Sequence, residues 1–168
     1  YNTYFKPNIA YLAIVGDVTV EEAKQLVTKY FGEWKKGDVP VVNYETPVAP
    51  AKTRVAFVHK EGAVQSVVNI AYPVDLKPGS PDAIKARIMN TILGGGSTAR
   101  LFMNLREDHG YTYGAYSNLS SGKLVGNFNA NAKVRNEVTD SSITQFMLEL
   151  NRMIDENVTE DELQGVKN

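Results

Sequence analysis

The chain has 168 residues, a length that suits one domain with a sizeable buried core. Its 18 Lys and Arg residues and 19 Asp and Glu residues give a net charge of −1, which favours neither nucleic acid nor an anionic membrane as a partner. The sequence has no cysteine, so thiol catalysis, disulfides and cysteine-based zinc sites are excluded. It contains no apolar run of the roughly 18 to 20 residues that span a bilayer.

The N-terminal part of the chain predicts a strand, a helix and a connector. Residues 9–15 form a continuous apolar run closed by a Gly-Asp turn, which is typical of a buried strand. Thr19 can cap a following helix because Glu22 stands three residues later, and Gly32 ends the apolar face of that helix. Residues 37–52 contain three prolines and little periodicity, so we expect an extended surface connector there.

The middle of the chain predicts two strands followed by two helices. Residues 54–60 alternate along the chain as in a strand, and residues 66–72 resemble a second strand after a short turn. Residues 82–93 carry apolar side chains at helical spacing, and the glycines 94–96 end that helix. A further helix is predicted from residue 97 or 98 to about residue 108.

The C-terminal part predicts a hairpin and a long helix. Residues 111–118 and 123–133 are strand-like and flank a Ser-Ser-Gly turn, and residues 140–156 form an amphipathic helix. This order favours an α+β fold, a mainly antiparallel sheet with helices packed on one face. The chain begins without Met, and a helix capped at Thr159 has little room before the last residue. We therefore expect residues 1–168 to be a single domain excised from a longer multi-domain chain.

Common catalytic motifs are missing from the sequence. The glycines 94–96 before Ser97 could bind a phosphate, but they lack the spacing of nucleotide-binding loops, and a helix-to-helix turn explains them better. His59 and His109 belong to neither H-E-x-x-H nor H-x-x-E-H, and no G-x-S-x-G sequence occurs. The residues therefore predict neither a zinc site nor a nucleophile in this chain.

One segment resembles a known family. Residues 94–114, G-G-G-S-T-A-R-L-F-M-N-L-R-E-D-H-G-Y-T-Y-G, are similar to a helix-to-strand segment of the pitrilysin and insulinase-like zinc peptidases, which include the mitochondrial processing peptidase. In that family the segment lies in a non-catalytic domain. The motifs F-K-P-N at residues 5–8, I-V-G-D-V at 14–18 and V-T-E-D-E-L at 158–163 follow in the family's order, so the resemblance covers nearly the whole chain. Thr98-Ala99 departs from the family's usual serine pair.

The resemblance implies a fold and a function. The fold would be that of the LuxS and mitochondrial-processing-peptidase-like metallopeptidases. The chain would be the substrate-binding, chamber-closing domain of a zinc-dependent endopeptidase that hydrolyses peptides. In this family the H-x-x-E-H motif lies on another domain, so zinc and the general-base glutamate would come from a partner domain or subunit of the same family. The chain itself would bind no cofactor and no metal, contain no catalytic residue and be inactive alone.

The resemblance also implies two substrate-binding residues. Arg106 and Tyr113 fall on the arginine and tyrosine with which the family contacts the substrate backbone near the zinc site. An arginine offers five N–H donors and a tyrosine a hydroxyl, so both can bind a peptide carbonyl and the oxyanion that develops from it. Tyr111 is a second tyrosine that competes for the role of Tyr113. In the alternative, Arg106 pairs with Glu107 or Asp108 and Tyr113 packs in the sheet.

Two other functions stay open at this point. The chain could be a structural subunit, like the non-catalytic core proteins of respiratory complexes in the same family, or an inactive relative of the peptidases. It could instead be a peptide-binding module that adds a substrate strand to an exposed sheet edge. The partners expected are a peptide and a zinc-binding domain, not a nucleic acid. For a bacterial member, the periplasm or cell envelope is favoured over the cytoplasm.

Overall fold

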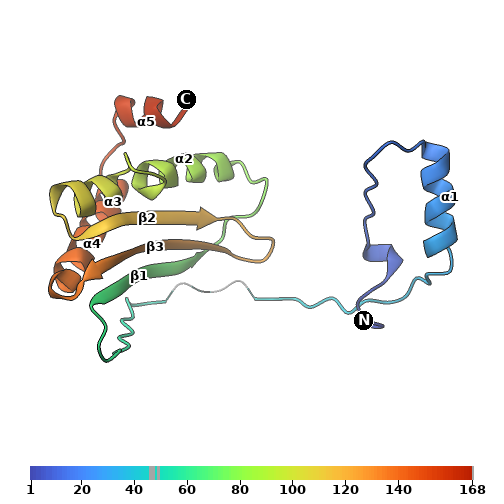
Figure 1. Ribbon diagram of the computed structural model, residues 1–168, viewed down its shortest axis with the longest axis horizontal. Coiled ribbons are helices and arrows are strands. Elements are labelled where there is room, and N and C mark those ends of the chain that lie inside the picture. The colour runs from blue at the N-terminus through green and yellow to red at the C-terminus, as the bar shows by residue number, and fades with distance from the viewer. Residues whose placement is uncertain (46–47, 49, 168) are drawn as a thin grey trace. The chain divides into compact units, whose positions relative to one another are not determined.

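The computed structural model describes residues 1–45, 48 and 50–167, and these fall into two compact units, Tyr1–Tyr44 and Glu45–Asn168. Figure 1 shows the elements of each unit. The predicted connector at residues 37–52 has neither helix nor strand among its described residues, and residues 46, 47 and 49 lie outside the description. In the described part of the chain, no helix is long and apolar enough to cross a membrane.

The first unit contains one capped helix. The helix α1 spans Val20–Phe31, as predicted, and a capping box begins it. The Thr19 hydroxyl accepts a hydrogen bond from the Glu22 backbone N–H at 3.2 Å, and the Glu22 carboxylate accepts one from the Thr19 backbone N–H at 2.9 Å. Such a cap satisfies backbone donors that have no partner inside the helix. The indole N–H of Trp34 donates to the carbonyl of Phe5 at 3.3 Å.

Two predicted strands are wrong. Residues 9–15 and 54–60 form no strand; Ile9 is the last residue of a short 3-10 helix, η1 (Pro7–Ile9), and residues 10–15 have neither helix nor strand. Their apolar side chains are exposed, Tyr11 at 102% and Val55 at 89%. Apolar alternation identifies a segment that could be buried, but a strand forms only when a neighbouring strand accepts and donates its backbone hydrogen bonds. Among the described residues of its own unit, neither segment pairs with such a neighbour.

The second unit contains a three-stranded antiparallel sheet. Its strands are β1 (Gln65–Val74), β2 (Thr112–Ser120) and β3 (Gly126–Arg135), in the spatial order β1-β3-β2. The predicted hairpin of β2 and β3 is confirmed, and β1 pairs with β3 from Gln65 opposite Arg135 to Val74 opposite Gly126. Along β3 the buried and exposed residues alternate, so one face of the sheet lies in the core and the other is open.

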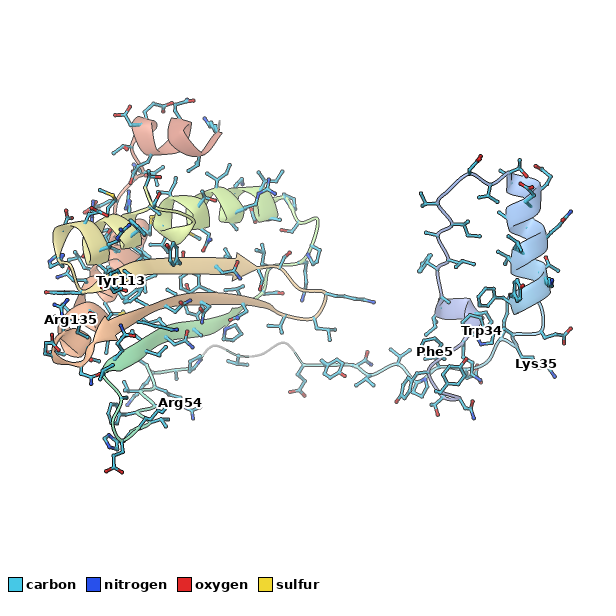
Figure 2. All side chains as sticks on the ribbon, viewed as in Figure 1. Phe5, Trp34, Lys35, Arg54, Tyr113 and Arg135 are labelled. Atoms are coloured by element: carbon cyan, nitrogen blue, oxygen red, sulfur yellow. The ribbon has the colours of Figure 1, made fainter. Side chains whose placement is uncertain are left out.

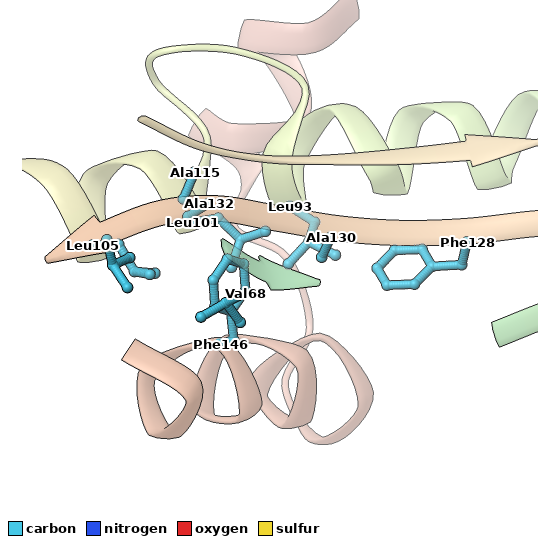
Figure 3. Close-up of a cluster of buried hydrophobic side chains, with 10 residues drawn as sticks. Val68, Leu93, Leu101, Leu105, Ala115, Phe128, Ala130, Ala132 and Phe146 are labelled. Carbon is cyan, nitrogen blue, oxygen red and sulfur yellow. The ribbon is translucent and has the colours of Figure 1, made fainter. Parts of the chain in front are cut away.

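Helices cover the buried face of this sheet. They are α2 (Asp82–Gly94), α3 (Arg100–Phe102) continued by a π-helix η2 (Met103–Asp108), and α4 (Thr139–Asp155). A 3-10 turn, η3 (Asn136–Val138), precedes α4, and α5 (Glu160–Lys167) ends the described chain. The core between helices and sheet, drawn in Figure 3, comprises Val68, Leu93, Leu101, Leu105, Ala115, Phe128, Ala130, Ala132, Val134 and Phe146. The predicted α+β class is confirmed.

Gly94 lets helix α2 approach strand β2 closely. A Cβ at this position would lie 2.4 Å from the backbone N of Ser117, whereas a Cβ at Gly96 would meet nothing within 4 Å. We expect Gly94→Ala to lower the free energy of unfolding by about 2 kcal/mol, because the helix or strand must shift. Gly96→Ala is the matched control and should change stability little. Urea unfolding of both variants measures the difference, and equal losses would contradict this explanation.

Candidate functional site

A β-bulge in strand β2 turns Tyr113 outward. Thr112 lies opposite Val134 and Ala115 opposite Ala132, so β2 contains one more residue than β3 between these two pairs. The Thr112 hydroxyl accepts a hydrogen bond from the Gly114 N–H at 3.1 Å and donates one to the Lys133 carbonyl at 2.7 Å. A bulge re-aims the side chain beside it. The Tyr113 side chain is consequently 89% exposed, so the alternative in which it packs in the sheet is wrong (Figure 2).

An open hollow lies next to Tyr113 on the sheet. It has a volume of about 360 Å³ and is lined by residues of all three strands, including Tyr113, Tyr116 and Lys133. Gly114 shapes it, because a Cβ at that position would come within 2.7 Å of the Tyr116 ring. A glycine there lets this ring lie across the backbone. Two tyrosine side chains therefore border one open hollow on the sheet.

Arg106 lies on the π-helix η2. The wider helical turn is visible in the hydrogen bond from the His109 N–H to the Asn104 carbonyl, at 3.1 Å. The Arg106 guanidinium carbon is 4.8 Å from the centre of the Phe102 ring, and one of its nitrogens is 3.6 Å from the Glu107 carboxylate. Half of the Arg106 side chain is exposed, so the ion pair with Glu107 is weak and leaves N–H donors for a ligand.

Aromatic side chains connect Arg106 with the hollow. The Phe102 ring under Arg106 lies 5.9 Å from the Tyr116 ring, centre to centre, and Tyr116 borders the hollow together with Tyr113. Arg106, Phe102, Tyr116 and Tyr113 are thus successive neighbours, and the Phe102 ring among them is buried. The described contacts of Arg106 are with Phe102 and Glu107 and do not include Tyr113.

Tyr111 is placed differently from Tyr113. Its ring centre lies 5.0 Å from that of His109, and its backbone N–H donates to the Leu105 carbonyl at 2.9 Å. The His109 Nδ1 in turn lies 2.9 Å from the Asn104 carbonyl, so the imidazole is part of the helix end. Tyr111 is half-buried in this contact and does not line the hollow. The geometry therefore favours Tyr113 over Tyr111 as the exposed tyrosine.

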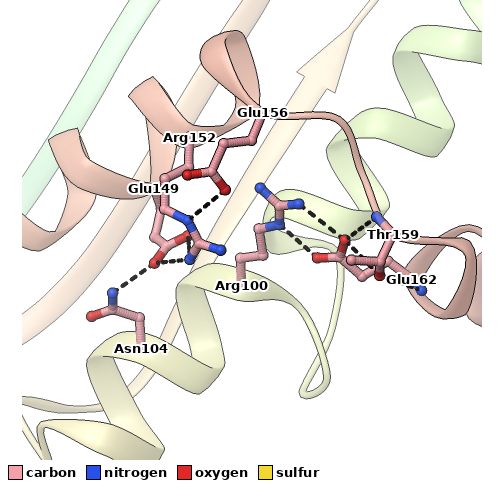
Figure 4. Close-up of polar contacts among 7 residues, drawn as sticks. All are labelled: Arg100, Asn104, Glu149, Arg152, Glu156, Thr159 and Glu162. Carbon is pink, nitrogen blue, oxygen red and sulfur yellow. Dashed lines mark hydrogen bonds and ion pairs between the residues drawn. The ribbon is translucent and has the colours of Figure 1, made fainter.

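A second polar cluster ties the helices together, as Figure 4 shows. The Arg100 guanidinium, which is nine-tenths buried, donates to both carboxylate oxygens of Glu162, at 2.6 and 2.9 Å. The hydrogen bonds from Arg100 lower the pKa of Glu162 from 4.5 to about 2. Buried Glu149 accepts from Asn104 at 2.7 Å and from Arg152 at 3.1 Å. This cluster joins α3, η2, α4 and α5.

Sequence reasoning missed this cluster. The capping box of Thr159 and Glu162 is visible in the sequence, and the structure confirms it at helix α5. The partner Arg100 is 62 residues away, and no local pattern connects the two. The cluster is a structural feature, since its charges are paired with one another. Among residues 1–45, 48 and 50–167, no group of three or more His, Cys, Asp and Glu side chains could hold a metal ion.

The second unit has an α+β fold, and its Tyr113 and Arg106 side chains are exposed and half-exposed, respectively. Residues 1–168 match the model of the Peptidase M16 inactive domain, and the chain belongs to this family. The resemblance read from the sequence is thereby confirmed at the level of the family. Over 114 residues the chain is 27% identical to the "Probable inactive metalloprotease YmfF" of Bacillus subtilis (strain 168), covering 67% of this chain and 26% of that protein.

Solved structures agree with this assignment at the level of the fold. A peptidase M16 inactive domain from Pseudomonas fluorescens matches 90% of the chain with a TM-score of 0.73 and 24% identity. The periplasmic protease PqqL from Escherichia coli matches 90% of the chain with a TM-score of 0.69 and 19% identity. The chain spans 36% of the first of these chains and 17% of the second.

Proposed function

We propose that residues 1–168 form a substrate-binding domain that closes the chamber of a zinc-dependent endopeptidase. The zinc ion and the general-base glutamate belong, in this proposal, to a second domain or subunit of the same family. The chain is one domain of that larger assembly and is inactive by itself. The M16 inactive-domain family supports a non-catalytic role, and the periplasmic neighbour PqqL supports a periplasmic or envelope location.

The exposure of Tyr113 is the observation that carries this proposal. A tyrosine in a half-buried sheet is normally packed, yet the bulge after Thr112 presents the Tyr113 side chain almost completely to solvent. The Arg106 side chain is half-exposed and contacts the Phe102 ring. An exposed hydroxyl and a half-exposed guanidinium can each donate hydrogen bonds to a ligand.

The chemistry of these two groups suits peptide hydrolysis. A zinc ion on the partner would activate water for attack on the peptide carbonyl. The Tyr113 hydroxyl and the Arg106 N–H groups would donate hydrogen bonds to substrate carbonyl oxygens, and most strongly to the oxyanion that forms during attack. Because the carbonyl gains negative charge in the transition state, such donors bind the transition state more tightly than the substrate.

Kinetics of the assembled peptidase test this assignment. We expect Arg106→Ala and Tyr113→Phe each to lower kcat/KM for an unfolded peptide roughly 100-fold or more when the chain is mixed with the zinc-binding domain. Arg87→Ala and Tyr111→Phe are the matched controls, since Arg87 is exposed on α2 and Tyr111 does not line the hollow. Unchanged rates in both test variants, or equal losses in the controls, would refute the assignment.

A structural, non-catalytic subunit is the second candidate, because the curated relative is described as an inactive metalloprotease. The same mixing experiment separates the two. If the partner binds zinc and associates with this chain but no peptide is cleaved, the structural role is correct and the substrate-binding role is wrong.

A further inference from the structure

The open face of the sheet has an unusual composition. The strands β1, β2 and β3 contain no Asp or Glu, although the whole chain contains 19. The charged residues of these strands are Lys133 and Arg135, and Arg135 is paired with Glu137 at 2.7 Å. Asparagines occupy five of the outward positions: Asn69 on β1, Asn118 on β2, and Asn127, Asn129 and Asn131 on β3. We call these five residues the asparagine face.

These asparagines are poor choices for a strand. Asparagine is depleted in β-strands, where threonine and other β-branched residues are preferred. A face that repeatedly departs from strand preference, with no packing reason, is typical of a functional surface. These side chains point away from the core, so packing in the core does not explain their identity.

The amides are already ordered with respect to one another. Asn131 lies opposite Asn69, and Asn118 lies opposite Asn129. The Asn131 amide N–H donates to the Asn129 side-chain oxygen at 2.8 Å, and the Asn129 amide donates to the Asn69 oxygen. Each amide has two donor hydrogens and an acceptor oxygen, so further donors and acceptors face outward. The ordering reduces the entropy lost when a ligand binds.

The spacing of the asparagine face matches an extended peptide. Alternate residues along β3 are about 6.6 to 6.8 Å apart, which is also the two-residue repeat of an extended chain. A side-chain amide carries the same donor and acceptor as a peptide unit, so consecutive asparagines can bind successive backbone groups. Asn131 and Lys133 line the same hollow as Tyr113, so the asparagine face is continuous with the proposed substrate site.

Charge distinguishes the two ends of this surface. Among the described residues no ion pair engages Lys133, and no carboxylate of the three strands opposes it. A negative group on a ligand would therefore find an attractive charge at the Tyr113 end and no repulsion along the strands. This charge complementarity favours a peptide with a carboxylate near that end.

We propose that the asparagine face holds an extended peptide segment, binding its backbone amides through Asn131, Asn129 and Asn127, with a peptide carboxylate at Lys133. The inference rests on the proposed function in that both share the hollow beside Tyr113. It adds a surface that binds the part of the substrate away from the cleaved bond. This surface recognises the extended backbone of the peptide more than the sequence of its side chains.

Equilibrium binding to the full chain tests this inference. The probe is a short, unstructured, fluorescently labelled peptide with one Asp, followed by fluorescence anisotropy. The double variant Asn129→Thr/Asn131→Thr should weaken binding roughly tenfold, as expected for two or more lost hydrogen bonds. Its Tm is measured in parallel and should stay close to that of the natural chain, because the strand preference of threonine offsets the lost Asn–Asn hydrogen bonds. An unchanged Tm shows that lost binding does not come from unfolding. Asn151→Ala, at an exposed asparagine on α4, is the matched control.

Two changes in the probe test the mode of binding. Replacing alternate backbone amides of the peptide by esters should weaken binding, because esters lack the N–H donor. Replacing Asp by Asn in the peptide should weaken binding to the natural chain and leave binding to Lys133→Gln unchanged. A peptide that added to a sheet edge would be ester-sensitive but unaffected by the Asn→Thr changes, and that result would overturn the inference.

The outcomes also separate this inference from the proposed function. If the Asn→Thr variant loses binding while Arg106→Ala and Tyr113→Phe leave cleavage unchanged, the asparagine face is correct and the proposed catalytic contribution is wrong. If cleavage depends on Arg106 and Tyr113 but the Asn→Thr variant binds normally, the asparagine face is wrong and the proposed function stands. Absence of any peptide binding to the natural chain would overturn the inference directly.

Discussion

Phe146→Ala is expected to lower the free energy of unfolding of the second unit by about 4 kcal/mol. The Phe146 side chain, on α4, is fully buried and packs in the core against the sheet (Figure 3). Its removal takes away the transfer free energy of a large aromatic ring and leaves a cavity that neighbours such as Leu105 fill only in part. A loss of this size is a large fraction of the stability of a typical domain.

A neighbour on the same helix provides the control for Phe146. The Leu148 side chain is 47% exposed, so Leu148→Ala removes less buried area from the same element. We expect this variant to lower the free energy of unfolding by about 1 kcal/mol or less. Urea unfolding followed by circular dichroism measures both changes. Similar losses in the two variants would show that α4 does not pack on the sheet as described.

Glu162→Gln is expected to lower the free energy of unfolding by about 3 kcal/mol, because it leaves the buried Arg100 guanidinium without its counter-charge. Arg100 is nine-tenths buried and donates two hydrogen bonds to Glu162 (Figure 4). Asp161→Asn, at an exposed neighbour in the same helical turn, is the control and should change stability little. Replacing both Arg100 and Glu162 by Met should recover much of the loss, because no unpaired charge remains buried.

The contribution of Glu162 should depend on pH in a defined direction. Its pKa in the folded chain is about 2, below the usual value of 4.5, because Arg100 donates to the ionised carboxylate. The unfolded state therefore takes up the proton first as pH falls. The stabilisation is complete above pH 4.5 and is lost as pH decreases towards 2. The stability difference between the natural chain and Glu162→Gln should shrink over this range, and a constant difference would contradict the assignment.

Local sequence patterns were sufficient to predict those elements whose structure depends on residues close together in the chain. The capping boxes at Thr19 and Thr159 located the starts of α1 and α5, since a cap is made by residues three apart. Apolar spacing located α2 and α4, and polarity alternation located β1 and β3. The motif around residues 94–114 identified the family, which the match over residues 1–168 confirmed.

The candidate site was predictable only in part. Arg106 and Tyr113 came from the family resemblance, and their role in substrate binding stays a prediction. The sequence did not show that a bulge exposes Tyr113 or that Arg106 lies over the Phe102 ring. A signal for the asparagine face was present in the alternation N-F-N-A-N of residues 127–131, because alternate residues of a strand share one face. Reading it required knowing which face the helices leave open.

The sequence by itself therefore determined the helices, most of the sheet and the family, because these follow from contacts between residues close along the chain or from a shared motif. Only the tertiary structure decided that residues 9–15 and 54–60 do not join a sheet, that Arg100 meets Glu162, and that Tyr113 faces outward. Strand pairing, buried ion pairs and bulges depend on partners distant in sequence. Local side-chain patterns carry no information on which distant segment supplies that partner.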